Sequence, residues 1–312
     1  MNNSEKTPMV LILMGTYNGE AYIREQLDSI ALQTHKKWNL LISDDGSDDT
    51  TIDIAREWAK EVGFEKVIIR NGPKQGFAQN FLSMACDPTL KSDFYAFADQ
   101  DDVWHPNKIQ IGLDALLKIE KCDGPKLYCG RTTYVNEKLD IFSESPIFNR
   151  SPSFRNALVQ SLAGGNTMIF DNSVKNLLEK TGRLNIVSHD WWLYQLISGV
   201  GGTVYYDKTP LVLYRQHKYA LVGGNSSWRA QFRRNYQALN GRFKKYLDIN
   251  IKSLEMVQNS LTLKNQEILL LFIKLRKAKF KSRLKTLIKI RIYRQKIVGT
   301  LGIHALAIIN KL

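Results

Sequence analysis

Three features that would place the chain in a membrane, in the secretory pathway or among disulfide-bonded proteins are missing. No stretch approaches the roughly 20 consecutive apolar residues of a transmembrane helix. The apolar run at residues 9–14 is too short for a secretory signal and leads directly into a turn. The only cysteines, Cys86, Cys122 and Cys129, are odd in number and stand at no metal-ligand spacing, which indicates reduced thiols in a cytosolic protein.

Two glycine-rich motifs of nucleotide-binding proteins are also absent. No Gly-x-Gly-x-x-Gly follows the first predicted strand, and no Gly-x-x-x-x-Gly-Lys-Ser/Thr occurs in the chain. The first absence argues against a dinucleotide redox cofactor, and the second argues against a P-loop NTPase. If the protein binds a nucleotide, we expect a metal ion, not a glycine loop, to hold its diphosphate.

Acidic residues are scarce toward the C-terminus. Residues 226–312 contain 20 Lys and Arg but only 3 Asp and Glu, whereas residues 1–225 have a slight acidic excess. The formal net charge of +14 is therefore a property of the tail. We place a domain boundary between residues 225 and 226, with a basic α-helical region after it.

The tail has the pattern of amphipathic helices. Residues 228–248 carry aromatic and aliphatic side chains at spacings of three and four, residues 267–290 interleave apolar and basic residues, and residues 297–309 are apolar but too short to span a bilayer. Basic amphipathic helices favour binding to an anionic membrane surface. The alternative is a helical subdomain packed on the rest of the protein. No motif supports binding to nucleic acid.

Apolar segments and amphipathic segments alternate in the first hundred residues. Strands are predicted at residues 9–15, 38–43, 66–70 and 93–98, and helices at residues 21–32, 50–62 and 76–85. This order predicts an α/β fold with a mostly parallel, doubly wound sheet. An apolar content of 44% is ordinary for such a protein.

Polar residues follow three of these strands. They lie at residues 16–20, 44–49 and 99–102. Ligands of such sheets bind outside the carboxyl ends of the strands, so the three segments are expected to share one site. Asp44 and Asp45 could accept hydrogen bonds from a ribose and a base. They could instead cap the following helix, a role equally open to Ser47 or Asp48.

The densest acidic cluster follows the fourth strand, where residues 94–102 read Phe-Tyr-Ala-Phe-Ala-Asp-Gln-Asp-Asp. Three acids within four residues repel one another, and a divalent cation that carries a diphosphate would offset their charge. Magnesium and manganese are commonly bound by one or two carboxylates together with substrate phosphates. The alternative is a solvated acidic turn.

Together these motifs resemble glycosyltransferase family 2, whose members have the GT-A fold. Thr-Tyr-Asn-Gly-Glu at residues 16–20, Asp-Asp-Gly-Ser-Asp-Asp at 44–49 and Asp-Gln-Asp-Asp at 99–102 carry the likeness, which covers residues 9 to about 225. The resemblance implies a nucleotide-sugar donor, Mg²⁺ or Mn²⁺, and inversion at the anomeric carbon. Carried over by position, the resemblance implies that Thr16, Asn18 and Glu20 line the nucleotide pocket and that Asp44 and Asp45 hold the base or ribose. Asn80, in a Gly-x-x-x-Asn stretch, would lie near the donor. Asp99 and Asp101 would form the metal-binding pair, with Asp101 favoured as the direct ligand.

The resemblance also assigns a catalytic base. At residues 188–192, Ser-His-Asp-Trp-Trp opens a predicted helix, where the family commonly has an acidic pair whose second member is the base. Asp190 matches that second acid and would take the proton of the acceptor hydroxyl. His189 replaces the first acid and is the local alternative. The two tryptophans form either a sugar platform or part of the core.

The last matching segment is Leu-Val-Leu-Tyr-Arg-Gln-His at residues 211–217. In the family a histidine here can complete the metal site and a nearby arginine can face the diphosphate, which assigns these roles to His217 and Arg215. This ending resembles the bacterial rhamnosyltransferase branch, which uses dTDP-L-rhamnose. The branch often has an asparagine a few residues later, where this chain has Lys-Tyr-Ala-Leu at residues 218–221.

These observations predict an inverting glycosyltransferase that acts at the cytoplasmic face of the cell membrane as a peripheral protein. Its acceptor is predicted to be a lipid-linked saccharide in bacterial surface polysaccharide synthesis. Two alternatives stay open: the same fold with a UDP-hexose donor, and a non-catalytic basic protein that binds membranes.

Overall fold

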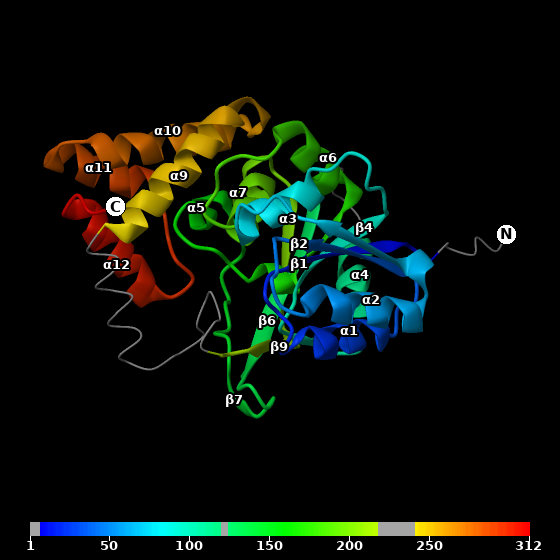
Figure 1. Ribbon diagram of the computed structural model, residues 1–312. Helices are drawn as coiled ribbons and strands as arrows, with labels where there is room; N and C mark the ends of the chain where they lie inside the picture. The colour runs from blue at the N-terminus through cyan, green and yellow to red at the C-terminus, as the bar shows by residue number, and fades with distance from the viewer. Residues whose placement is uncertain (1–6, 120–123, 218–240) are drawn as a thin grey trace.

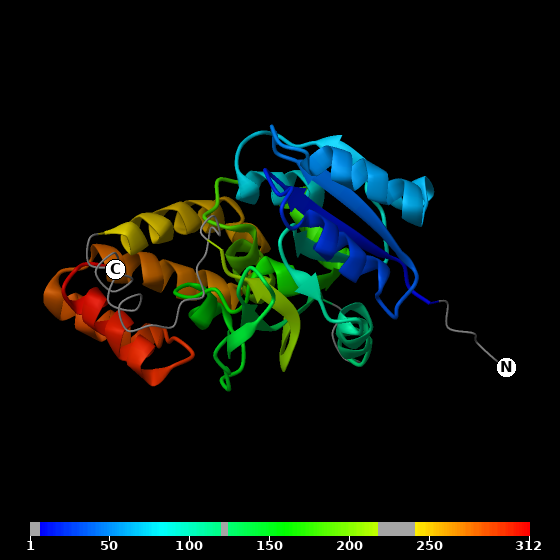
Figure 2. The same cartoon turned by 60° about the horizontal axis from the view of Figure 1, so that its bottom comes forward.

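The molecule has two lobes: a mixed β-sheet with helices on both faces, and beside it a group of C-terminal helices (Figures 1 and 2). The computed structural model describes residues 7–119, 124–217 and 241–312. The α/β fold with a C-terminal helical extension agrees with the fold predicted from the sequence.

The first four strands form the parallel part of the sheet, in the order β3-β2-β1-β4. Each ends one residue later than predicted, so that Thr16, Asp44 and Asp99 are the last residues of their strands. The strands are nearly all apolar because both faces of the sheet are covered. Their bounds are β1 Val10–Thr16, β2 Trp38–Asp44, β3 Val67–Asn71 and β4 Phe94–Asp99.

Helices cover the two faces of this sheet and form two cores. Alternate residues of β1 point to opposite sides: Leu11 and Leu13 enter the core beneath α3, and Ile12 enters the core beneath α1, α2 and α4. Helix α1 buries Ile23, Leu27 and Ile30, the face that its sequence predicts. The helices are α1 Ile23–Ala31, α2 Thr51–Val62, α3 Phe77–Ala85 and α4 Lys108–Leu117, and a short 3₁₀ turn η1 spans Phe64–Lys66.

The second half of the sheet is mixed, in the order β4-β8-β6-β9-β5, with β7 paired to β6. Strand β8 runs antiparallel to β4 and β6, β9 runs parallel to β6, and β5 runs antiparallel to β9. The elements are β5 Val103–Trp104, β6 Lys126–Val135, β7 Ile141–Glu144, α5 Phe154–Ala157, η2 Gly165–Thr167, β8 Ile169–Asp171, α6 Asn172–Thr181, α7 His189–Gly199 and β9 Thr203–Arg215.

The C-terminal helices dock on the sheet lobe and share its core. Trp191 of α7 stacks on Phe243 with 6.3 Å between ring centroids, and Leu254 and Phe272 belong to the same cluster of buried side chains as Leu193. The tail is thus packed on the rest of the protein. The helices are α9 Arg242–Met256, α10 Leu263–Lys277, α11 Phe280–Ile290 and α12 Ile297–Ile308, and the short turn η3 spans Gln258–Ser260.

The C-terminal helices differ from the prediction in one place and agree with it in another. The single helix expected at residues 267–290 is two helices, because Ala278 and Lys279 adopt extended backbone (ψ 154° and 159°). No glycine or proline marks this break, which folds α11 back so that Leu287 and Ile290 become buried. The helix predicted at residues 297–309 is confirmed. The boundary between residues 225 and 226, and most of the stripe in residues 228–248, lie outside the described residues.

Neither of the two described cysteines, Cys86 and Cys129, is in a disulfide bond; the third, Cys122, lies outside the described residues. Burial raises the pKa of the Cys86 thiol to about 11, so this cysteine stays protonated and unreactive. Within the described part of the chain, no helix combines the length and hydropathy that crossing a bilayer requires.

Candidate active site

The carboxyl ends of β1, β2 and β4 bring the three polar segments to one edge of the sheet. In the strand register, Thr16 pairs with Asp44 and Gly15 pairs with Asp99. The loops after these strands therefore start side by side, as the predicted topology requires.

The loop after β1 and the loop after β2 are joined by hydrogen bonds. Asn18, with the positive φ of 47° that asparagine tolerates, accepts from Asp48 N at 3.0 Å and donates its own N–H to Ser47 Oγ at 2.9 Å. Glu20 Oε2 accepts from Thr50 Oγ1 at 2.7 Å. Asn18 and Glu20 are exposed at this edge of the sheet, where their hydrogen bonds hold the two loops together.

Asp44 is buried and its carboxylate is fully engaged by the protein. Oδ1 accepts from Thr16 Oγ1 at 2.8 Å and from Ser47 Oγ at 2.6 Å, and Oδ2 accepts from the N–H groups of Gly46 and Ser47 at 3.1 and 2.8 Å. Thr16 and Asp44 are 2% and 6% exposed. Both residues thus build the floor of the edge and offer no open hydrogen-bonding atom to a ligand in this arrangement.

Asp45 and Asn80 connect the edge to the start of α3. The Asp45 carboxylate accepts from the backbone N–H groups of Lys74 and Gly76 at 2.6 and 2.7 Å. Asn80 is buried against β2, where it accepts from Ser43 Oγ at 2.6 Å and donates to Ser43 O at 2.7 Å. Asp45 stays half-buried at the edge, whereas Asn80 lies beneath it.

The acidic loop after β4 is fixed to the loop after β1 through Gln100. Its side chain accepts from Tyr17 N at 2.8 Å and donates to Tyr17 O at 2.9 Å. Asp99 is half-buried, and the loss of surrounding water, together with the nearby carboxylates of Asp101 and Asp190, raises its pKa to about 7. The edge thus brings carboxyl groups so close together that ionisation of Asp99 is disfavoured.

Asp101 and His217 lie together, as the resemblance implies. His217 Nε2 is 2.8 Å from Asp101 Oδ2, and the two side chains are 8% and 19% exposed, respectively. Arg215 is placed differently from the prediction: it is fully buried, donates to Asp101 O at 3.0 Å, to Glu137 O and to Glu25, and lies over the ring of Tyr22. It supports the backbone of Asp101 and does not point its guanidinium into an open site.

Asp102 lies inside the protein and links the acidic loop to the turn η2. It has no exposed surface, and its Oδ2 accepts from Asn166 Nδ2 at 2.6 Å. Burial and the nearby Asp101 and Asp99 raise its pKa. Lys108 lies close by with its Nζ 3.5 Å from the Trp104 ring centroid, and burial lowers its pKa to about 7 although Asp102 and Asp99 oppose that shift.

Asp190 is in the first turn of α7 and is close enough to Asp99 to raise the pKa of that carboxyl group. Ser161 Oγ donates to Asp190 Oδ2 at 3.3 Å, and the side chain is half-buried. Asp190 thus lies on the same edge as Asp99 and Asp101. The two tryptophans that follow it, Trp191 and Trp192, are buried in the core.

His189 is unsuited to proton transfer. It is 4% exposed, stacks on Phe81 at 4.0 Å and contacts Phe97 at 4.8 Å between ring centroids. Neither ring nitrogen has a hydrogen-bond partner among the described residues, and burial lowers the pKa of His189 to about 4. A Cβ on Gly165 would lie 2.1 Å from His189 Nε2, so the glycine of this turn makes room for the imidazole.

The burial of His189 predicts a loss of stability in acid. Between its ordinary pKa of 6.5 and about 4, the unfolded chain binds a proton that the folded chain does not, so stability falls as the pH falls. From about pH 7 to pH 5 this one group should cost about 2 kcal/mol. In urea titrations at both pH values, His189→Leu should lose that much less stability than the unsubstituted protein. Equal losses would contradict a buried neutral imidazole.

The donor atoms at the edge fit a hard divalent cation. Asp101 and His217 supply carboxylate oxygen and imidazole nitrogen, and a cation would relieve the repulsion among the carboxyl groups of Asp99, Asp101 and Asp190. Across the described ranges, no three His, Cys, Asp or Glu side chains already surround a common point. A metal here would thus take its remaining ligands from water or from a substrate, as magnesium commonly does.

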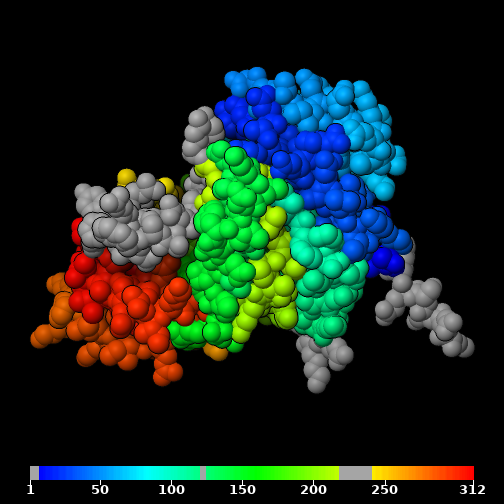
Figure 3. All heavy atoms as spheres, turned by 90° about the horizontal axis from the view of Figure 1, so that it is seen from below, coloured from blue at the N-terminus to red at the C-terminus, as the bar shows by residue number. Residues whose placement is uncertain are grey.

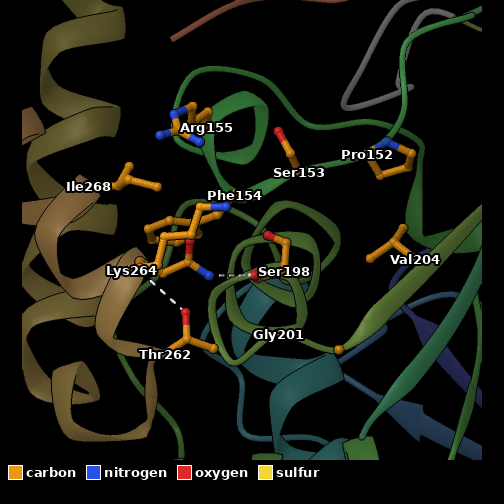
Figure 4. A pocket seen from close by; sticks show the side chains of 12 residues that line it. Pro152, Ser153, Phe154, Arg155, Ser198, Gly201, Val204, Thr262, Lys264 and Ile268 are labelled. Atoms are coloured by element: carbon orange, nitrogen blue, oxygen red, sulfur yellow. Dashed lines mark hydrogen bonds between the residues drawn. The ribbon is translucent and has the colours of Figure 1, made fainter. Parts of the chain in front are cut away.

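A cavity of about 310 Å³ lies between the two lobes at the opposite end of α7 from Asp190 (Figure 4). Its amide and guanidinium groups are occupied: Asn265 donates to Ser198 O and Gly199 O at 3.0 and 2.8 Å, and Arg155 Nε donates to Ile290 O at 2.8 Å. These bonds join α10 and α11 to the sheet lobe. The cavity is part of the packing between the lobes and lies apart from the acidic edge.

Sequence reasoning missed four residues of the site. Gln100, Asn166, Ser161 and Lys108 contact or lie beside the predicted acids, but Asn166 and Ser161 are distant in sequence from the acids that they contact, and no motif marks Lys108. Only Gln100 could have been found, because it lies inside the Asp-Gln-Asp-Asp segment itself.

Sequence comparison gives a family and relatives. The model described as Glycosyl transferase family 2 matches residues 11–178. The dTDP-rhamnosyl transferase RfbG of Shigella flexneri is 31% identical over 234 residues, which cover 71% of this chain and 77% of that protein. The uncharacterized glycosyltransferase RT0329 of Rickettsia typhi is 27% identical over 233 residues, which cover 70% of this chain and 67% of that protein.

Solved structures share the fold. S. aureus TarS 1-349 in complex with UDP-GlcNAc has a TM-score of 0.58 at 13% identity, with 96% of this chain and 81% of that chain covered. The mannosyltransferase PcManGT from Pyrobaculum calidifontis, in complex with GDP-Man and Mn²⁺, has a TM-score of 0.53 at 16% identity, with 98% and 87% covered. These likenesses confirm the GT-A fold.

The family match includes all three polar loops of the acidic edge, since they fall within residues 11–178. The predicted resemblance and the prediction of a glycosyltransferase are confirmed. The protein is a glycosyltransferase with the GT-A fold, and its chain belongs to glycosyl transferase family 2.

Proposed function

We propose that this enzyme moves L-rhamnose from dTDP-L-rhamnose to a hydroxyl of a lipid-linked saccharide, with inversion at the anomeric carbon. The reaction would serve bacterial surface polysaccharide synthesis at the cytoplasmic face of the cell membrane. The observation that carries the proposal is the convergence of Asp99, Asp101 and Asp190 at the carboxyl edge of the sheet. The name of the Shigella flexneri relative supports the donor.

Asp101 and His217, with Asp99 beside them, would hold Mg²⁺ or Mn²⁺ at this edge. The Mn²⁺ in the mannosyltransferase complex supports a divalent ion. Such an ion would neutralise the charge of the nucleoside diphosphate as it leaves. Arg215 supports this role through its hydrogen bond to Asp101 O at 3.0 Å, which fixes the backbone of the loop.

The nucleotide would lie over the loops after β1 and β2. Asn18 and Glu20 frame the pocket from one side, and Asp45 stands at the edge on the other. In this proposal Thr16, Asp44 and Asn80 act from beneath, because they hold the ends of β1 and β2 and the start of α3 in place. The aligned loops orient the donor without a glycine-rich phosphate loop.

Asp190 would act as the base. As the acceptor oxygen forms its bond to the anomeric carbon and the bond from that carbon to the phosphate oxygen breaks, the hydroxyl proton passes to the Asp190 carboxylate. Ser161, which donates to Asp190 at 3.3 Å, would orient that carboxylate. One displacement inverts the anomeric centre and needs no covalent intermediate on the protein.

A thermal-shift panel tests the donor. The full chain would be heated with dTDP, UDP or GDP, and with their sugar conjugates, each with Mn²⁺ or with a chelator. We expect the largest rise in Tm with dTDP and dTDP-L-rhamnose in the presence of Mn²⁺, because a ligand at 100 times its Kd adds about 2.7 kcal/mol to the stability of the folded state. A rise confined to UDP and a UDP-hexose would replace the rhamnose assignment, and no rise with any of them would contradict the proposed function.

A further inference from the structure

Helix α12 presents an apolar face to solvent. Ile297, Val298 and Leu301 are 75%, 80% and 63% exposed. At 3.6 residues per turn, these three side chains fall within about 100° of arc, so they form one patch. No Lys, Arg, Asp or Glu interrupts the chain between Lys296 and Lys311.

The opposite side of α12 is firmly packed, so the outward direction of the patch is fixed. Ile303 and Ala307 are each 2% exposed and belong to the large core cluster. His304 Nε2 shares a hydrogen bond of 2.9 Å with Ile292 O, and Arg294 N donates to Thr300 Oγ1 at 3.0 Å. The exposed face is thus part of an ordered helix that is anchored to the rest of the molecule.

Basic residues are frequent in the part of the chain that carries the patch. After Glu267 the chain contains 12 Lys and Arg and no Asp or Glu. On α11, Lys285 and Lys289 are exposed beside Ile288, which is 77% exposed, and Lys296 stands directly before α12. Among the described residues, Arg276 pairs with Asp248 at 2.7 Å, and Arg283 is buried and donates to Ile308 O and Asn310 Oδ1. The exposed Lys285, Lys289 and Lys296 can offer their charge to an anionic partner.

Another exposed apolar group lies on the same side of the molecule. Seen from below, the α12 region and the segment around β7 both face the viewer (Figure 3). In β7, Ile141 and Phe142 are 67% and 54% exposed. The segments α12 and β7, which both face this side, thus each have exposed apolar side chains.

We propose that this underside rests on an anionic lipid bilayer. The side chains of Ile297, Val298 and Leu301 enter the boundary between headgroups and acyl chains, and the neighbouring lysines contact lipid phosphates. With 12 residues, α12 is about 18 Å long, too short to span a bilayer and suited to lie along its surface.

Charge and chemistry favour lipid over other partners. A second copy that met the patch through its own C-terminal helices would bring the same positive charge against it and be repelled. A nucleic acid would use the lysines but would leave the aliphatic face in water. A bilayer of anionic lipids satisfies both features at once. That the acceptor is held in the same membrane rests on the proposed function.

Vesicle flotation with the full chain tests this surface. The protein should float with vesicles of phosphatidylglycerol and phosphatidylcholine and stay behind with phosphatidylcholine alone. The triple variant Ile297→Ser, Val298→Ser, Leu301→Ser should reduce partitioning at least about tenfold. Lys285→Gln, Lys289→Gln and Lys296→Gln should each reduce it by up to about fivefold and weaken its salt dependence.

The matched control is the double variant Leu32→Ser, Phe64→Ser in the sheet lobe, where these side chains are 67% and 62% exposed. It should float like the unsubstituted chain. Unchanged flotation of the triple variant would overturn the proposal, as would equal binding to neutral vesicles. If the protein did not bind vesicles but sedimented as a dimer, and the triple variant sedimented as a monomer, the patch would be a self-association surface and the proposal would be wrong. Vesicle flotation needs no nucleotide. A negative flotation result would therefore not contradict the proposed donor, and a negative thermal-shift result would not contradict binding to vesicles.

Discussion

Replacing Asp190 by Asn should lower kcat for sugar transfer by about 10²–10⁴-fold, the contribution typical of a positioned general base. The amide has nearly the same shape as the carboxylate and can still accept from Ser161 Oγ, which lies 3.3 Å from Asp190 Oδ2. It cannot take the proton of the acceptor hydroxyl. Donor affinity, measured by titration calorimetry, should change little, since Asp190 acts on the acceptor.

The matched control for this variant is Asp53→Asn. Asp53, like Asp190, is an acid in the first turn of a helix, and its side chain is exposed. Both variants lose one carboxylate near a helix N-terminus, so the control accounts for that effect on the helix. If Asp190→Asn retained the turnover of the Asp53→Asn control, the base would have to lie elsewhere. His189, with its pKa lowered to about 4, would then need a rearranged core before it could serve.

Replacing Asp101 by Asn should remove the metal dependence of donor binding. The variant loses the anionic partner that lies 2.8 Å from His217 Nε2 and reduces the negative charge around Asp99. Because a bound ion stabilises a leaving diphosphate by several kcal/mol, turnover should fall by about 100-fold or more. Calorimetric titration of the nucleoside diphosphate with and without Mn²⁺ should give nearly equal affinities.

Asp48→Asn is the control for this second variant. Asp48 belongs to the neighbouring acidic loop and has an exposed side chain, so its removal changes the net charge of the edge without touching the Asp101–His217 pair. It should keep the difference between affinities with and without Mn²⁺. An Asp101→Asn protein in which Mn²⁺ still strengthens donor binding as it does in the control would refute the metal role of Asp101.

Much of the fold could be predicted because its signals are local. Buried parallel strands are apolar throughout, and the helices between them have one apolar face, so residues 9–98 gave the order and type of the elements correctly. The position of three polar loops at one edge followed from topology alone. The break at Ala278 and Lys279 could not be predicted, because no glycine or proline marks it and only packing of α11 against the core requires it.

The sequence likewise allows only part of the site to be predicted. Motif spacing could identify Asp101 and His217 as residues that might meet, and they lie 2.8 Å apart. It could not tell that Asp44 has four hydrogen bonds from the protein or that Arg215 is fully buried. An aspartate or arginine is written with the same letter in the sequence whether its side chain bonds to protein groups, water or a ligand.

The sequence by itself determined the α/β order, the acidic edge and the basic tail, since each depends on residues that are near one another in the chain. Only the tertiary structure decided which acids are buried and bonded by the protein, because that depends on partners such as Asn166 and Ser161 from distant segments. It likewise decided that His189 is enclosed by Phe81 and Phe97, while Ile297 and Leu301 face water. Burial is set by long-range packing, and packing also determines which polar groups are left for chemistry.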